Sequence, residues 1–291
     1  MSVIEAIAAP LRYPFMVRAL IAAVLVGGLS AIVGTYVVLR SMAFLGDALA
    51  HSVLPGVAVG FLVSGRGDRR ALFWWALGTA IAVSFGIGWI SRQGRIKEET
   101  AIGIVFAGMF SLGIALMSTV RGFAVDLVHF LFGNVLGASS WDIAMIAGFG
   151  GGVILIIFLF YKEFLIVSFD PTLATTLRLP VWFYRYLLLI LIAITVVVSL
   201  QTVGLALMLA MLITPATTGY LLARRLPGMM AIGAAIGILS GIIGLYLSFY
   251  FGIASGAAIV LMAIGFFLIV LLVSPRRGFI RRILRSAKEG G

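Results

Sequence analysis

Asp47 and His51 stand four residues apart in the apolar stretch SMAFLGDALAHSVLPGVAVGF, residues 41–61. On an α-helix this spacing places both side chains on one face, within reach of one shared ion. A carboxylate supplies charge and a hard oxygen, and a neutral imidazole supplies a borderline nitrogen, which together suit a divalent transition-metal cation. Pro55 and Gly56 weaken the helix one turn later, as is common beside transport sites. We predict that the pair contacts a metal ion; in the alternative interpretation it only fixes helix packing.

The composition places this pair in an integral membrane protein. The 291 residues are 63% hydrophobic and 11% charged, with a mean hydropathy of +1.21, whereas roughly a quarter of the residues in a soluble domain are charged. Many runs are long enough to cross a hydrocarbon core of about 30 Å as helices. They are apolar on all sides, unlike the alternating strands of a β-barrel. We therefore expect an all-α, polytopic transmembrane bundle of about eight or nine helices. The predicted runs are residues 15–39, 41–63, 71–90, 101–119, 141–160, 183–200, 204–222, 229–250 and 253–273.

Basic residues indicate the orientation of the chain. If the polar segment 162–182 is cytoplasmic, only six of the 21 lysines and arginines lie outside: Arg12, Arg18, Arg66, Arg69, Arg70 and Arg121. The positive-inside rule favours this arrangement, which predicts a cytoplasmic C-terminus. A run that fails to span would instead place the N-terminus inside. The net charge of +11 then reflects topology and contact with lipid headgroups, and it gives no reason to expect nucleic-acid binding.

This orientation also sets the depth of the candidate site. Counted from Arg40 at the cytoplasmic boundary, Asp47 lies about 10 Å and His51 about 16 Å into the bilayer. An ionised aspartate at the centre of a membrane helix costs roughly 2.5 to 3.5 kcal/mol on insertion scales. Asp47 should therefore face a cavity or a partner charge.

The chain is expected to form one membrane domain over residues 1–291, with a basic cytoplasmic tail at about 275–291. The first run lacks the features of a cleaved signal peptide and is expected to be retained. There is no cysteine, so disulfides and thiolate metal sites are excluded. Gly233, Gly237 and Gly241 are spaced four apart, which allows a neighbouring helix to approach closely. We favour packing within the chain over a dimer seam for this stripe.

Three other polar residues are candidates for the ion pathway. His129 follows Asp126 by three residues between the fourth and fifth long runs. It could contact an entering ion or a docked binding protein, although a satisfied interface histidine is the favoured interpretation. Gln201 is expected at the start of a helix near the outer surface, where a role in orienting backbone or water and a packing role are weighted equally.

Glu98 and Glu99 stand beside basic residues at the start of the fourth run. Their neighbours are Arg92, Arg95 and Lys97. Exposed charges of both signs at a membrane boundary usually form a solvated cluster of little energetic weight. We therefore predict a solvated cytoplasmic charge cluster here.

Motifs for chemistry on nucleotides or peptides are absent from the sequence. It contains neither GxxxxGK[ST], the loop that cradles nucleotide phosphates, nor HExxH. No grouping of serine, histidine and an acid suggests an intramembrane hydrolase. The chain is therefore predicted not to be an enzyme, and any ATP must act through another subunit.

Four sequence blocks resemble the membrane permeases of ABC importers for manganese, zinc and iron. The most specific is MAFLGDALAHSVLPGVAVGF, followed in the expected order by DLVHFLFGNVLG at 126–137, SFDPTLATTLRLPV at 168–181 and QTVGLALMLAMLITPATTGYLL at 201–222. The LPG at 54–56 and the HFLFGNVLG segment are more similar to the manganese/iron branch than to the zinc branch. The resemblance implies that Asp47 and His51 line the ion pathway. It also implies that the segment 162–182 docks on the ATPase through Asp170, Pro171 and Ala174.

The resemblance further implies a permease that works in an assembly. Two copies would form a pore around the second helix in the bacterial cytoplasmic membrane, with a cytoplasmic ATPase dimer and an extracytoplasmic solute-binding protein. The cargo would be Mn²⁺ first and Zn²⁺ or Fe²⁺ next, since first-row divalent ions compete for the same ligand types. No permanently bound cofactor is expected. The alternative is a proton-coupled secondary transporter that uses Asp47 and His51 as a relay, which would leave the docking-like segment without a purpose.

Overall fold

The computed structural model describes residues 8–64, 69–94, 96–119 and 135–273. Within these ranges the regular elements are all helical, and nine spans are long and apolar enough to cross a membrane. The prediction of an all-α transmembrane bundle is thus confirmed. The spans are α2 (Pro14–Leu39), α3 with α4 (Phe44–Ser52 and Leu54–Ser64), α5 (Arg69–Gln93), α6 (Glu98–Ser118), α8 with the π-helix η2 and α9 (Ser140–Met145, Ile146–Gly150 and Gly151–Leu159), α12 (Val181–Val203), α13 (Leu205–Leu222), α14 (Leu226–Phe251) and α15 (Ser255–Val273).

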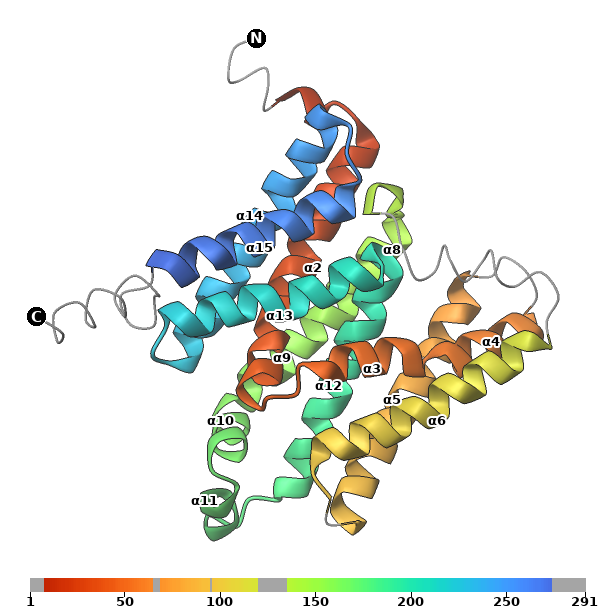
Figure 1. The fold of residues 1–291 in the computed structure, drawn as a ribbon, viewed down its shortest axis with the longest axis vertical. Helices are drawn as coiled ribbons and strands as arrows, with labels where there is room; N and C mark the ends of the chain where they lie inside the picture. The colour runs from red at the N-terminus through yellow and green to blue at the C-terminus, as the bar shows by residue number, and fades with distance from the viewer. Residues whose placement is uncertain (1–7, 65–68, 95, 120–134, 274–291) are drawn as a thin grey trace, which may run out of the picture.

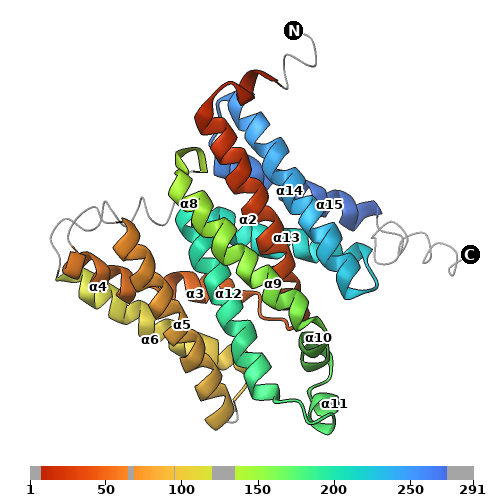
Figure 2. The same ribbon diagram turned by 180° about the vertical axis from the view of Figure 1, so that it is seen from behind.

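Helix α12 lies between two groups of helices. It packs against α2 on one side and α5 on the other. Helices α3, α4, α5 and α6 form one group, and α2, α13, α14 and α15 form the second (Figure 1). Two short helices, α10 (Tyr161–Phe169) and α11 (Pro171–Thr176), project from the end of the molecule opposite the start of α2, as both Figure 1 and Figure 2 show. A 3-10 turn, η1 (Val135–Gly137), precedes α8.

The second span is interrupted where the sequence contains Pro55 and Gly56. Helix α3 ends at Ser52 and α4 begins at Leu54, so the proline falls in the first turn of the new helix, where its missing N–H leaves no internal bond unmade. Gly56 serves close packing, because a Cβ there would lie 2.6 Å from the carbonyl oxygen of Trp75 on α5. The predicted weakening of this helix is therefore confirmed as a break between α3 and α4.

Glycines bring α2 and α14 into backbone contact. A Cβ on Gly237 would lie 2.6 Å from the carbonyl oxygen of Gly27, and one on Gly241 would lie 3.1 Å from the Cβ of Ala23. Gly233 packs in the same way against Pro215 of α13. The stripe predicted from the sequence therefore packs within the chain, as favoured. Small residues are the usual means by which membrane helices approach closely.

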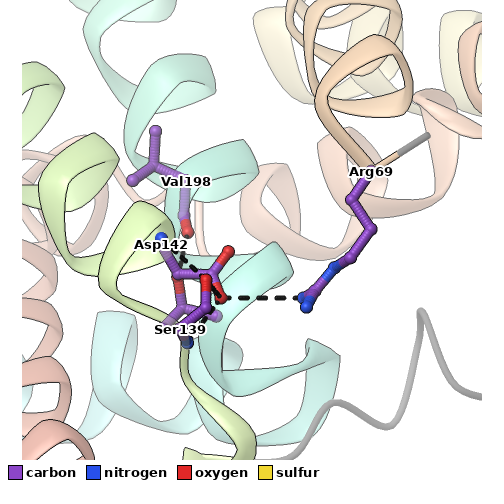
Figure 3. A network of polar contacts seen from close by, with 5 residues as sticks. Arg69, Ser139, Asp142 and Val198 are labelled. Atoms are coloured by element: carbon purple, nitrogen blue, oxygen red, sulfur yellow. Dashed lines mark hydrogen bonds and ion pairs between the residues drawn. The ribbon is translucent and has the colours of Figure 1, made fainter.

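A polar network joins the starts of α5 and α8 (Figure 3), and α8 starts on the side of the molecule where α2 begins (Figure 1). The Asp142 carboxylate accepts hydrogen bonds from the Ser139 backbone N–H (2.9 Å) and hydroxyl (2.7 Å), and the Asp142 N–H donates to the Ser139 hydroxyl oxygen. This reciprocal capping box starts α8. Arg69 is the first residue of α5, and its Nη2 atom lies 3.7 Å from Oδ2 of the same buried carboxylate. The spacing of Ser139 and Asp142 is a recognisable capping signal that our sequence analysis missed.

A second ion pair joins the residue after the last turn of α2 to the first residue of α6. The Arg40 guanidinium, directly after α2, donates a 2.8 Å hydrogen bond to the carboxylate of Glu98, the first residue of α6. Their side chains are only 8% and 17% exposed. The predicted solvated cluster is therefore wrong for Glu98, because the turn between α2 and α3 brings a distant arginine against it. Glu99 is exposed, as expected.

We expect Gly237→Ala to destabilise the bundle, because the new methyl group would overlap the carbonyl of Gly27. Overpacking of this kind costs about 1 to 3 kcal/mol. Thermal unfolding of the purified chain in detergent measures the effect as a lower Tm. Gly265→Ala on α15 is the matched control, since a Cβ there has no neighbour within 4 Å. Equal unfolding temperatures for the two variants would contradict this account of the contact.

Candidate metal-ion site

Helix α3 presents the predicted pair on one face. The His51 Nε2 atom lies 3.5 Å from Asp47 Oδ1, and the two side chains are 24% and 34% exposed. This separation is long for a hydrogen bond. The carboxylate and the imidazole are therefore neighbours without a tight bond, and both side chains can shift toward a shared ion. Both side chains are thus partly accessible and retain capacity for a ligand.

Aromatic rings of α6 form a wall beside His51. The Phe110 ring centroid lies 5.4 Å from that of the imidazole and the Phe106 centroid lies 6.2 Å away, both edge to face. Phe106 also packs edge to face against Phe44 at the start of α3, with ring centroids 5.5 Å apart. We call Phe44, Phe106 and Phe110 the aromatic wall. It orients the imidazole and keeps water from one side of it.

The second imidazole nitrogen has no protein partner. His51 Nδ1 is buried and makes no hydrogen bond within the described structure, whereas a metal-bound histidine usually donates its other ring N–H to a partner. A buried polar atom without a partner costs free energy. His51 is therefore held by packing, with at least one nitrogen available to a ligand.

One chain supplies only part of a coordination sphere. Among the described residues, no group of three or more histidine, aspartate or glutamate side chains is placed to hold a metal ion. Asp47 and His51 together offer two ligands, whereas transition-metal sites use four or more. The described part of one chain thus supplies two ligands, and further ligands are needed to complete a coordination sphere.

Of the other predicted pathway residues, only Gln201 can be placed. Asp126 and His129 lie outside the described residues. Gln201 is partly buried in the last turn of α12, so the expectation that it begins a helix is wrong. Helix α12 continues past Gln201 and ends at Val203. The next residue, Gly204, has a φ of 84° and a ψ of 169°, which suit glycine and end the helix.

The predicted docking residues shape the short helix α11. The Asp170 side chain accepts hydrogen bonds from the backbone N–H groups of Thr172 (3.0 Å) and Leu173 (2.9 Å), and Pro171 occupies the first helical position. This is a standard start for a helix. Ala174 is fully buried, whereas Leu173 and Leu177 are about half exposed, at 47% and 52%. Helix α11 thus presents apolar side chains beyond the spans.

The aromatic wall and the partner of Glu98 were not among the sequence predictions. Phe106 and Phe110 are four residues apart, which marks one face of a helix. That signal shows that they share a face, but it does not show which helix they meet. The same holds for Arg40 and Glu98, which are separated by 58 residues.

Comparison with known proteins gives consistent matches over nearly the whole chain. The model of the ABC 3 transport family matches residues 12–274. The manganese transport system membrane protein MntC of Halalkalibacterium halodurans is 43% identical over 281 residues, covering 96% of this chain and 94% of the relative. A probable iron transport system membrane protein of Haemophilus influenzae is 34% identical over 280 residues, covering 96% and 97%.

A solved structure agrees with this result. PsaBC from Streptococcus pneumoniae in complex with Fab contains a chain that is 37% identical, with a TM-score of 0.81 and coverage of 96% of this chain and 99% of that chain. Sequence and architecture therefore point the same way, and the chain belongs to the ABC 3 transport family.

Proposed function

We propose that this protein is the membrane permease subunit of an ATP-binding-cassette importer that moves a divalent transition-metal cation into the cell. The observation that carries the proposal is the Asp47 and His51 pair on one face of α3, where the second span breaks. The proposal is supported by the ABC 3 family match and by relatives named as manganese and iron transport membrane proteins. It places the chain in the bacterial cytoplasmic membrane.

The two side chains play different parts in the proposed mechanism. The Asp47 carboxylate attracts the cation and offsets part of its charge as it loses water. The His51 imidazole favours a transition-metal ion over Ca²⁺ and Mg²⁺, which prefer an all-oxygen shell. Binding is moderate, because an ion held too tightly could not leave. The proposed cargo is Mn²⁺, ahead of Fe²⁺ and Zn²⁺. Relatives named as manganese and iron transport system membrane proteins support the first two ions.

The partial coordination sphere supports a homodimer. Two copies facing one ion would together contribute two carboxylates and two imidazoles, which is up to four ligands. An extracytoplasmic solute-binding protein delivers the ion, and a cytoplasmic ATPase dimer drives alternating access through the segment around α11. The chain itself is a transport component and no enzyme.

The competing proposal, a proton-coupled carrier with Asp47 and His51 as a relay, has less support. It assigns no role to the exposed apolar side chains of α11, and the family match is to ABC transport. Uptake without any ATPase subunit would favour it.

The first test is ATP-dependent uptake of radiolabelled Mn²⁺ into vesicles that hold the permease with its ATPase and binding protein. Asp47→Asn and His51→Ala should each lower uptake by about tenfold or more, since losing one ligand group weakens a metal site by at least that factor. Complex assembly and ATP hydrolysis should remain. Glu99→Gln, which alters an exposed carboxylate, is the control and should transport normally. Undiminished uptake in both site variants would assign the pair to packing.

The docking role of α11 is tested by a change at its exposed surface. Leu173→Glu should lower the affinity for the purified ATPase subunit about tenfold, because it places a charge in an apolar contact worth roughly 1.4 kcal/mol or more. Leu11→Glu is the matched control, since Leu11 is 48% exposed and precedes α2, which begins at the end of the molecule opposite α11 (Figure 1). Asp170→Ala should weaken binding less, because removing a cap costs about 0.5 to 2 kcal/mol of local helix stability. Equal ATPase affinities for the Leu173→Glu and Leu11→Glu variants would refute this docking surface.

A further inference from the structure

Helix α6 lies at the periphery of the described bundle. It packs mainly against α3, α4 and α5, and only 17% of its most apolar 18-residue window is buried. The corresponding figure for the span formed by α3 and α4 is 72%. Helix α6 is therefore a peripheral helix that packs over the well-buried span formed by α3 and α4. An ion pair at its start adds to the contacts that hold it in place.

The Arg40 and Glu98 pair anchors the same end of α6 that leads to the candidate site. Arg40 precedes Asp47 by seven residues across the turn that leads into α3, and Glu98 precedes Phe106 by eight residues, about 12 Å along α6. The pair thus joins the elements that carry the metal-ligand pair and the aromatic wall. It lies on the side of the site toward α10 and α11, which the basic residues assign to the cytoplasm.

The turn after α2 holds Arg40 in place. The Arg40 N–H donates to the Tyr36 carbonyl, the Met42 N–H donates to the Val37 carbonyl, and Ser41 adopts a φ of 55°. A non-glycine residue in this region marks a constrained turn. These bonds hold Arg40 at the end of α2, so opening of the pair would release the start of α6 from α2.

Hydrogen bonds compensate only part of the burial of the Arg40 and Glu98 side chains. Among the described residues, Arg40 Nη1 and Glu98 Oε1 are buried without hydrogen-bond partners, as is Nε of Arg185 on α12. Burial lowers the pKa of the Arg40 guanidinium, the Glu98 carboxylate opposes that shift, and the Arg185 charge adds to it. Arginine stays charged through such shifts. Desolvation offsets much of the attraction between the charges of a buried pair. Separating the two side chains would therefore cost little free energy, because water then hydrates both charges.

We propose that Arg40 and Glu98 are positioning residues that hold α6 over Asp47 and His51 and close the candidate site toward the cytoplasm. The proposal rests on the function assigned above, in which an ion leaves the site on that side. Opening of the pair lets α6, with Phe106 and Phe110, move away from α3, and closing restores the barrier.

A thiol-labelling experiment tests the barrier without requiring metal transport. The chain has no native cysteine, so Asp47→Cys in the full-length protein gives one reactive site. A membrane-impermeant methanethiosulfonate reagent is applied from the cytoplasmic side of inside-out vesicles. We expect Glu98→Gln to speed labelling about tenfold or more. Glu99→Gln, at the exposed neighbour, should leave the rate unchanged, and Arg185→Gln should not raise it.

Two further measurements separate a barrier from general loss of structure. Reversing the charges with Arg40→Glu and Glu98→Arg together should restore slow labelling, while either reversal alone should label rapidly. With Asp47 intact, Glu98→Gln should increase Mn²⁺ flux in the absence of ATP. Equal labelling rates in all backgrounds, or rapid labelling with the pair intact, would overturn the proposal. If Asp47→Asn and His51→Ala both leave uptake unchanged, the proposed role of the pair in the ion pathway fails, whereas the labelling rates still test the barrier.

Discussion

A carboxylate and an imidazole within a membrane span cannot face lipid, and the arrangement of this protein follows from that constraint. Hydrocarbon offers no hydrogen bonds and little screening, so both groups need a sheltered surface. Helix α3 therefore lies inside the bundle, packed against α12 and α6. The interruption at Val53 lets the chain place Asp47 and His51 on one short helix and continue across the membrane as a second one.

Close helix packing makes that sheltered position available. Without a strong hydrophobic drive between helices in lipid, association depends on van der Waals contact and small residues. Gly27 and Gly237 bring α2 and α14 into backbone contact, and a Cβ on Gly34 would overlap the carbonyl of Leu212 on α13. These contacts build a firm core from α2, α13 and α14. Helices α6 and α15 are the least buried of the described spans.

Charged side chains are used mainly at the ends of the spans, where water is close. Asp142 and Arg69 join two helices at one end, and Arg40 and Glu98 join two at the other. The Asp142 carboxylate is satisfied by its capping box, whereas the Arg40 and Glu98 pair retains polar atoms without partners among the described residues. The end of the molecule with Arg40 and Glu98 is therefore the one where we propose that the spans open. The nearby helix α11 is the element proposed to receive the ATPase.

The sequence by itself determined the membrane spans, the helical class and the placement of Asp47 and His51 on one face. These features depend on the length of apolar runs and on the 3.6-residue period, both of which act over a few turns of chain. Only the tertiary structure paired Glu98 with Arg40, set Phe106 and Phe110 against His51, placed Gln201 within α12 and brought Arg69 to Asp142. Most of these contacts join residues far apart in the chain. Local periodicity states which residues share a face, but only packing of whole helices decides which faces meet.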